Sequence, residues 1–307
     1  MKRTISLIIA IAVMIAMFIV PVSAADEVYS AAEITGEGDW ILADDISGNL
    51  NITEGTYTID LDDYTWAGQL IITGGTITIK NGTVEATQLG DAIDIQGNAT
   101  VVLENLTVIG AHTQGDGVFV GGSTDVTIKN CVVTGGKAGL DTVTAEATVS
   151  VENTTFADFA ELAVDQPKDS AGRNCAIELR ANAKVELKGE NKFNVSTIIC
   201  RSNSHTASFE SSFELGENVT ATFSDVVDLG EGSGNPYNAT TITYAYNGET
   251  TSTPSTPSTP STPSTPSTPS TPDNNNNNAD TGDFMSLVIV VAAAALVVTV
   301  LSKKRAF

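Results

Sequence analysis

The sequence predicts an all-β protein built around a right-handed parallel β-helix, followed by a disordered Ser-Thr-Pro stalk and one transmembrane helix. Three observations predict the solenoid. They are a degenerate repeat of about 24 residues, short strands with alternating apolar and polar side chains, and asparagines at the same place in successive repeats. A unit this short cannot bury its own apolar side, whereas stacked units bury a continuous core. The runner-up folds are a β-sandwich and a β-barrel, which fit the turn spacing but leave the aligned asparagines unexplained.

The longer strand of the repeat recurs with an asparagine at its end. Four such segments superpose without gaps at spacings of 24, 25 and 23 residues: 76–81, 100–105, 125–130 and 148–153. Segment 56–61 begins the series, and segment 184–189 continues it after a step of 36 residues. Period-two alternation with β-branched residues is typical of half-buried strands. We expect the asparagines to stack in one turn and to hydrogen-bond along the axis: Asn81, Asn105, Asn130 and Asn153.

A second, shorter strand lies upstream in each repeat, at 70–72, 93–95, 118–120, 140–142 with one bulged residue, 177–179 and 198–200. The middle residues of these strands are expected to form one outward-facing column: Ile71, Asp94, Phe119, Asp141, Glu178 and Ile199. Because adjacent coils lie about 4.8 Å apart, Asp141 and Glu178 are expected within roughly 5 Å of each other. Asp94 is expected two coils from Asp141.

This pattern resembles the pectate-lyase-like β-helix superfamily over about residues 40–230. The resemblance implies the architecture, whereas the superfamily includes lyases, hydrolases, adhesins and spacers. Its sugar-active members keep their sites on the same sheet face. On this basis Asp94, Asp141 and Glu178 are the candidate catalytic acids, because paired carboxylates are the requirement for glycoside hydrolysis. Phe119 is a candidate ligand-binding residue that suits the apolar face of a pyranose.

Further candidates flank this column. Arg180 and Arg201 stack on adjacent coils and are candidate ligand-binding residues, although their place in the sequence puts them past the acidic column. Asp91 and Asp116 directly precede short strands and are candidates to share a Ca²⁺ ion with turn carbonyls; no other cofactor is expected. The alternative interpretation is that all of these are ordinary outward-facing polar residues and turn residues.

The remaining chemically distinctive residues suggest structural roles. His112 and His205 are expected in solvated turns. Cys200 is expected to point inward over Leu179, and the pairing of the three cysteines stays open. Residues 156–173 interrupt the solenoid and form either a binding loop or an inert insertion.

The N-terminal residues 1–24 have the pattern of an export signal. Two basic residues precede an apolar run over residues 5–20, and Val22 and Ala24 fit the small-residue rule for cleavage after Ala24. A retained membrane anchor is the alternative. Residues 25–250 are then the β-helix ectodomain.

Residues 251–278 are a low-complexity linker. Seven Ser-Thr-Pro repeats occupy residues 252–272 and are followed by Asp273 and five asparagines. Proline at every third position favours extended polyproline II, so the 21 residues reach roughly 65 Å. Such a segment is a stalk.

Residues 279–307 combine a short motif, an apolar run from Phe284 to Leu301, and a basic tail. This resembles the cell-wall sorting signal of Gram-positive surface proteins, in which a Leu-Pro-x-Thr-Gly motif precedes the span. Thr281 and Gly282 match the motif, but Asn278-Ala279 stands where the family has Leu-Pro. The resemblance implies sortase cleavage after Thr281 and attachment of that residue to peptidoglycan. Otherwise the apolar run is a single membrane-spanning anchor.

The net charge also limits the function. The chain carries 15 Lys and Arg against 37 Asp and Glu, and residues 26–250 alone have a net charge of −24. Nucleic acid is therefore not an expected partner, because phosphate binding needs clustered basic residues. The sequence predicts an extracellular protein anchored at the cell surface, to the cell wall or the membrane, as an adhesin-like or carbohydrate-binding module on a stalk. Its partners would be a polysaccharide or a host surface ligand. The alternatives are a surface polysaccharide lyase or glycoside hydrolase and a purely structural spacer.

Overall fold

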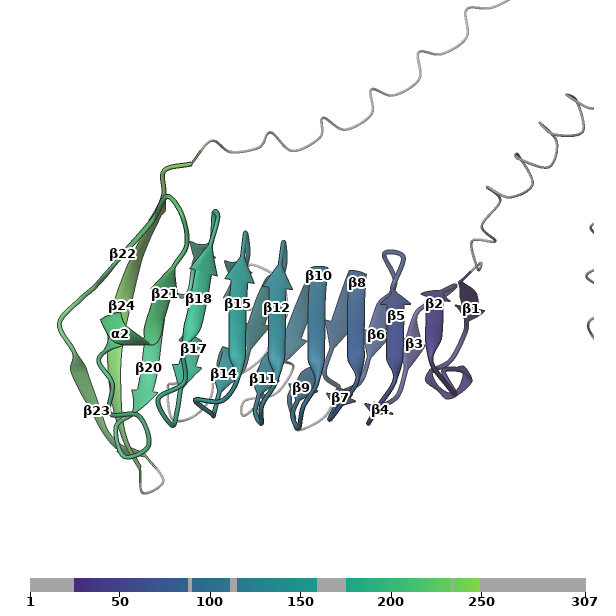
Figure 1. The fold of residues 1–307 in the computed structure, drawn as a ribbon, viewed down its shortest axis with the longest axis horizontal. Coiled ribbons are helices and arrows are strands. Elements are labelled where there is room, and N and C mark those ends of the chain that lie inside the picture. The colour runs from purple at the N-terminus through teal and green to yellow at the C-terminus, as the bar shows by residue number, and fades with distance from the viewer. Residues whose placement is uncertain (1–24, 88–89, 111–114, 159–174, 233–234, 249–307) are drawn as a thin grey trace, which may run out of the picture. The chain divides into compact units, whose positions relative to one another are not determined.

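The computed structural model describes residues 25–87, 90–110, 115–158, 175–232 and 235–248 (Figure 1). These residues form a right-handed parallel β-helix whose coils stack along one axis and have three sides. The prediction of an all-β parallel solenoid is confirmed for this part of the chain. Within the described residues no helix is long and apolar enough to cross a membrane, and the predicted span from Phe284 to Leu301 lies outside them.

The first side, here called face 1, is formed by the consecutively paired strands of a 14-stranded sheet within the described residues. These strands follow the order of the chain: β1 (Asp26–Val28), β2 (Gly38–Leu42), β5 (Thr56–Asp60), β8 (Thr76–Glu85), β10 (Thr100–Gly110), β12 (Asp125–Lys129), β15 (Thr148–Glu152), β18 (Val185–Lys188) and β21 (Phe213–Leu215). Thr76 pairs with Thr100, and Thr100 pairs with Asp125, in parallel register. The repeat alignment therefore predicts the register correctly.

The second side, face 2, belongs to the same sheet. Strands β8 and β10 are long enough to continue from face 1 into face 2, where their C-terminal halves pair with β6 and β13. The short strands of this face are β3 (Ile46–Ser47), β6 (Thr65–Ala67), β13 (Val132–Gly135), β16 (Thr155–Phe156) and β19 (Lys192–Phe193).

The third side, face 3, holds the upstream strands of the repeat. In the described structure they stack in parallel as part of a 10-stranded sheet: β4 (Leu50–Ile52), β7 (Leu70–Ile72), β9 (Ile93–Ile95), β11 (Val118–Val120), β14 (Ala138–Thr142), β17 (Cys175–Leu179) and β20 (Thr197–Arg201).

The turn between face 1 and face 2 explains the aligned asparagines. Asn81, Asn105, Asn130 and Asn153 all have left-handed backbone conformations, with φ between 48° and 59°. Asparagine adopts this conformation more readily than other residues that carry a Cβ atom. The Asn105 amide donates to Asn81 Oδ1 at 3.0 Å, and the Asn81 amide donates to Asp60 Oδ1 at 3.0 Å. The predicted ladder is confirmed between Asn105 and Asn81, and Asp60 continues it by one coil toward the N-terminus.

The last outward position before this turn carries charges of alternating sign from coil to coil. Cross-strand pairing places these residues in one row: Asp60, Lys80, Glu104, Lys129, Glu152 and Lys188. Lys80 Nζ lies 3.1 Å from Asp60 Oδ2, and Lys129 Nζ lies 3.0 Å from Glu104 Oε1. Opposite charges on adjacent strands favour this register over a slipped one.

The core fills the space between the three faces. It consists mainly of stacked aliphatic side chains, with Trp66 and Phe156 as the largest fully buried members. The Trp66 indole donates to Gly48 O at 2.9 Å, so its polar atom is satisfied inside the first coils.

The two ends of the solenoid depart from the simple repeat. At the N-terminal end, β1 and the 3₁₀ helix η1 (Ala31–Glu33) precede the first full coil. At the other end, β24 (Asn235–Tyr246) pairs antiparallel with β20, and it also pairs with β22 (Val219–Phe223) and β23 (Val227–Gly232). The short helix α2 (Phe209–Ser212) contributes Phe209, which stacks with Phe223, as does Phe213. This antiparallel cap has no counterpart in the repeat pattern.

Candidate functional site

The predicted column lies on face 3. Asp94 pairs with Ile71 and Phe119, Phe119 pairs with Asp141, and Glu178 pairs with Asp141 and Ile199. Asp141 and Glu178 are therefore on adjacent coils, and Asp94 is two coils from Asp141, as the repeat predicts.

The residues of this outward-facing column differ in their burial. Asp141 and Glu178 are both 0% exposed, whereas Asp94 and Phe119 are half-buried. A carboxylate removed from water needs compensating charges and hydrogen bonds. The contacts around Asp141 and Glu178 supply them.

Two arginines pair with the buried carboxylates. Arg180 donates through Nε to Glu178 Oε1 at 3.0 Å and through Nη2 to Asp141 Oδ2. Arg201 donates through Nε to Glu178 Oε1 at 2.7 Å, and its guanidinium carbon lies 5.0 Å from the ring centroid of Tyr237. In the chain Arg180 lies two residues past Glu178 and Arg201 two residues past Ile199, as predicted, but residues two apart in an extended chain project to the same side. The guanidinium groups then reach back along the strand and across to the next coil.

Lys137 completes the network and was not among the sequence-based candidates. Its Nζ lies 2.7 Å from both Asp116 Oδ2 and Asp141 Oδ2, and the residue is 8% exposed. The sequence contains one signal that could have identified it: Lys137 is the only basic residue between Lys129 and Lys168, in a stretch rich in acidic residues. We call Asp116, Lys137, Asp141, Glu178, Arg180 and Arg201 the ion-pair network.

The ion-pair network contains three acidic and three basic side chains, so its formal charges balance. Burial alone raises the pKa of Glu178, but the cations Lys137, Arg180 and Arg201 outweigh this effect and lower the pKa below its ordinary value. Burial likewise disfavours charged Lys137, yet Asp116 and Asp141 raise its pKa above the ordinary value. Glu178 and Lys137 are therefore held in their charged forms at neutral pH.

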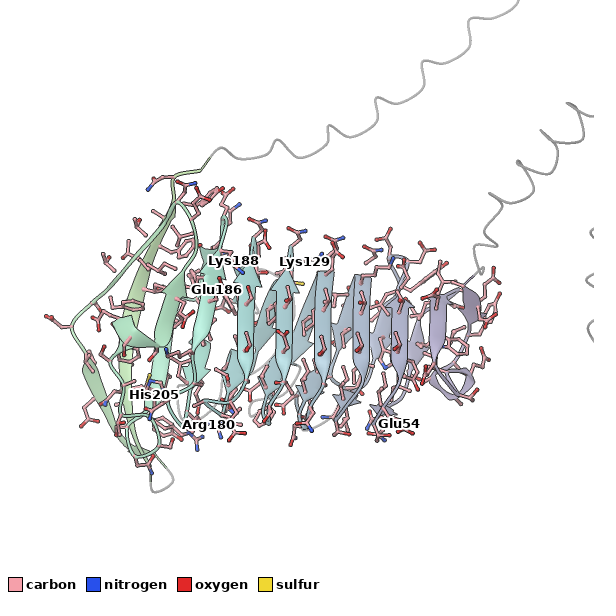
Figure 2. All side chains as sticks on the ribbon, viewed as in Figure 1. Glu54, Lys129, Arg180, Glu186, Lys188 and His205 are labelled. Atoms are coloured by element: carbon pink, nitrogen blue, oxygen red, sulfur yellow. The ribbon has the colours of Figure 1, made fainter. Side chains whose placement is uncertain are left out.

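Figure 2 places Arg180 at one edge of the stack, far from Lys129 and Lys188 at the opposite edge.

The two aspartates predicted to hold Ca²⁺ do stack on adjacent coils. Asp91 Oδ1 accepts the Asp116 backbone N–H at 2.7 Å, and Asp116 Oδ1 accepts the Ala138 N–H at 3.0 Å. The other Asp116 oxygen faces the Lys137 ammonium. Among the described residues no group of three or more His, Cys, Asp or Glu side chains is arranged around a metal position. Calcium binding at Asp91 and Asp116 stays a prediction.

His205 and the three cysteines are buried. His205 is 3% exposed and its Nε2 lies 2.8 Å from Ser212 Oγ, so the prediction of a solvated turn is wrong. The helix α2 turns Ser212 toward the ring. All three cysteines are buried free thiols, and Cys200 lies beside Leu179 in the sheet register, as expected. Burial raises the pKa of Cys131 to about 11 and that of Cys200 to about 12, so neither thiol is activated.

Several sequence-based predictions concern residues outside the described part of the chain. These are His112, most of the 156–173 excursion, the signal peptide over residues 1–24, the linker over residues 251–278, and the sorting residues Thr281 and Gly282. They stay predictions.

The family model for a right-handed β-helix region matches residues 70–248 of this chain. No curated protein and no solved structure matches the chain.

Proposed function

Because the chain belongs to the right-handed β-helix family, we propose that it is an adhesin-like, carbohydrate-binding module displayed at the cell surface. One observation carries the proposal over the enzymatic alternative: Asp141 and Glu178 are fully buried and paired with cations. The β-helix fold is compatible both with surface binding and with polysaccharide-acting proteins, so the choice depends on these side chains.

A glycosidase carboxylate must reach the glycosidic oxygen or the anomeric carbon, and the acid of the pair must carry a proton. Neither requirement suits Glu178, whose side chain is enclosed and whose pKa is lowered by three cations. Asp94 is half-buried and its carboxylate accepts hydrogen bonds from Gln96 Nε2 at 2.9 and 3.1 Å. Asp94 lies two coils from Asp141, and Phe119 lies on the coil between them. Burial raises the pKa of Asp94 and that of Asp141, but Asp141 is enclosed, and the column neighbours of Asp94 are Ile71 and Phe119 instead of a second carboxylate. The column is therefore better suited to stabilising the face than to cleaving a glycan.

The proposed surface location derives from the sequence at both ends of the chain. A signal peptide over residues 1–24 would export the β-helix. The Ser-Thr-Pro linker would hold it away from the membrane, and either the span from Phe284 to Leu301 or peptidoglycan linkage through Thr281 would retain it.

The test uses the full-length chain in detergent with insoluble neutral and acidic polysaccharides, with Ca²⁺ and with a chelator. Co-sedimentation would be measured in the same tubes as new reducing ends and unsaturated products. The proposal expects co-sedimentation without cleavage. Cleavage that is lost in Asp94→Asn or Asp141→Asn, each checked for folding by circular dichroism, would make the protein an enzyme. Absence of both binding and cleavage would favour a spacer.

A further inference from the structure

A second feature with the chemistry of a binding site lies at the C-terminal end of the solenoid. A pocket of about 490 Å³ is formed between residues 190–194, which include β19, and residues 242 and 244–246 of β24. Its lining includes three aromatic residues, Phe193, Tyr244 and Tyr246, and the polar residues Glu190 and Lys192. Its volume falls within the range of pockets that take small ligands.

The aromatic wall of the pocket is fixed from behind. Phe156 is buried in the core and stacks on Phe193, with ring centroids 5.2 Å apart and planes 18° apart. Phe193 in turn contacts Tyr244, with centroids 5.5 Å apart and a tilted geometry. Phe193 and Tyr244 are half-buried, so this row of rings extends from the core to the pocket surface.

Hydrogen bonds also hold Tyr244 in place. Its hydroxyl donates to Gly189 O at 2.6 Å and accepts from Asn191 Nδ2 at 3.1 Å. Asn191 is itself buried, and its Oδ1 accepts the Thr154 backbone N–H at 2.8 Å. The ring orientation is therefore set before any ligand arrives, which lowers the entropic cost of binding.

The charges at the pocket suit a neutral ligand. Glu190 and Lys192 carry opposite charges, are both exposed, and approach each other to 3.7 Å. Their carboxylate and ammonium groups offer hydrogen-bond acceptors and donors next to the rings. The strongly acidic ectodomain repels polyanions. Rings that contact the apolar face of a sugar, beside polar groups that contact its hydroxyls, match the chemistry of a pyranose.

We propose that this pocket is a binding site for a short neutral oligosaccharide. The inference rests on the proposed carbohydrate-binding function and assigns it to β19 and β24 instead of to the carboxylate column on face 3.

The test titrates the full-length chain in detergent with cellotetraose, xylotetraose and chitotetraose in its N-acetylated form, with tetragalacturonate as the anionic comparison. Binding would be followed by saturation-transfer NMR and calorimetry. Tyr246→Ala should weaken binding by about tenfold, and Tyr246→Phe should retain most of it, because the ring supplies the contact. Lys192→Ala should also weaken binding, because it removes the ammonium donor beside the rings and leaves the rings themselves unchanged. Tyr29→Ala is the matched control, since Tyr29 is 60% exposed and belongs to the N-terminal end.

The outcomes separate the pocket from the general function. If the chain binds a neutral oligosaccharide and both Tyr246→Ala and Lys192→Ala bind like the parent, the pocket assignment is overturned while the proposed function stands. If tetragalacturonate binds as tightly as the neutral sugars, the pocket assignment is overturned as well. If neither the oligosaccharides nor the polysaccharides bind, both proposals fail. Should Tyr246→Ala unfold, Lys192→Ala decides the question, because Lys192 is exposed and its ion pair is the one with the exposed Glu190.

Discussion

Replacement of Lys137 by methionine tests whether the ion-pair network holds face 3 together. The substitution keeps the length of the side chain and removes the ammonium that lies 2.7 Å from Asp116 Oδ2 and from Asp141 Oδ2. Asp141 keeps its contact with Arg180, whereas Asp116 loses the cation at its Oδ2 atom. The perturbation therefore leaves one buried carboxylate without its countercharge.

Removing one partner of a buried ion pair costs about 3–5 kcal/mol in the free energy of unfolding. For a domain of this size the expected decrease in the thermal midpoint is about 10 °C. Burial and the charge of Asp141 raise the pKa of Asp116, so the orphaned carboxylate binds a proton readily as the pH falls. The loss in Lys137→Met should consequently be smaller at pH 5 than at pH 8.

The assay is thermal and urea unfolding of the full-length chain, followed by far-ultraviolet circular dichroism. The double variant Lys137→Met with Asp116→Asn should recover part of the loss, because the amide oxygen still accepts the Ala138 N–H. Lys192→Met is the matched control: its exposed pair with Glu190 spans 3.7 Å and is worth less than about 1 kcal/mol. The reasoning is refuted if Lys137→Met and Lys192→Met unfold at the same temperature, or if the double variant recovers nothing.

Three further predictions concern the histidine, the thiols and the asparagine turn. Burial lowers the pKa of His205 in the folded chain below the ordinary histidine pKa of 6.5, so the unfolded chain binds a proton at a higher pH than the folded chain does. The free energy of unfolding should therefore fall as the pH decreases from about 7.5 to below 6.5. His205→Gln should reduce this dependence of stability on pH relative to the parent chain, and His112 is present in both proteins. An unchanged slope would contradict the lowered pKa of His205. The three buried cysteines should not react with a thiol reagent at pH 8 until the chain is unfolded by guanidinium, and rapid labelling of the native protein would show that their burial is incorrect. Asn105→Ala should destabilise by about 2 kcal/mol, because it loses the hydrogen bond to Asn81 and retains a strained φ of 54°. Asn105→Gly should lose about half as much, since glycine adopts that φ freely, and equal losses in the two variants would argue against backbone strain.

The register of the stack was predictable because every coil repeats the same local chemistry. The position of Thr76 opposite Thr100, and of Asp94 opposite Phe119, follows from aligning the repeat units alone. The left-handed turns were signalled by asparagine, and Gly189 occupies the equivalent position in the next coil with φ 63°. An added Cβ atom at Gly189 would collide with Asn153 Oδ1, which explains glycine there.

The candidate site was only partly predictable. Alternation identified Asp141 and Glu178 as outward-facing, which is correct, but it could not show that they are buried. Their enclosure depends on side chains from other segments, including Lys137 before β14 and Arg201 on the following coil, whose guanidinium packs on Tyr237. A period-two pattern distinguishes the two faces of a strand and contains no information about what packs on the outer face.

By itself the sequence determined the solenoid, its period, its register and its asparagine turns, because each depends on interactions between equivalent residues of neighbouring coils. Only the tertiary structure decided that the acidic column is an ion-pair network, that β24 closes the stack in the antiparallel direction, and that Phe193, Tyr244 and Tyr246 converge on one pocket. These features join residues that are distant in the sequence and share no repeat. Their positions are set by the three-dimensional path of the chain, which the local pattern does not encode.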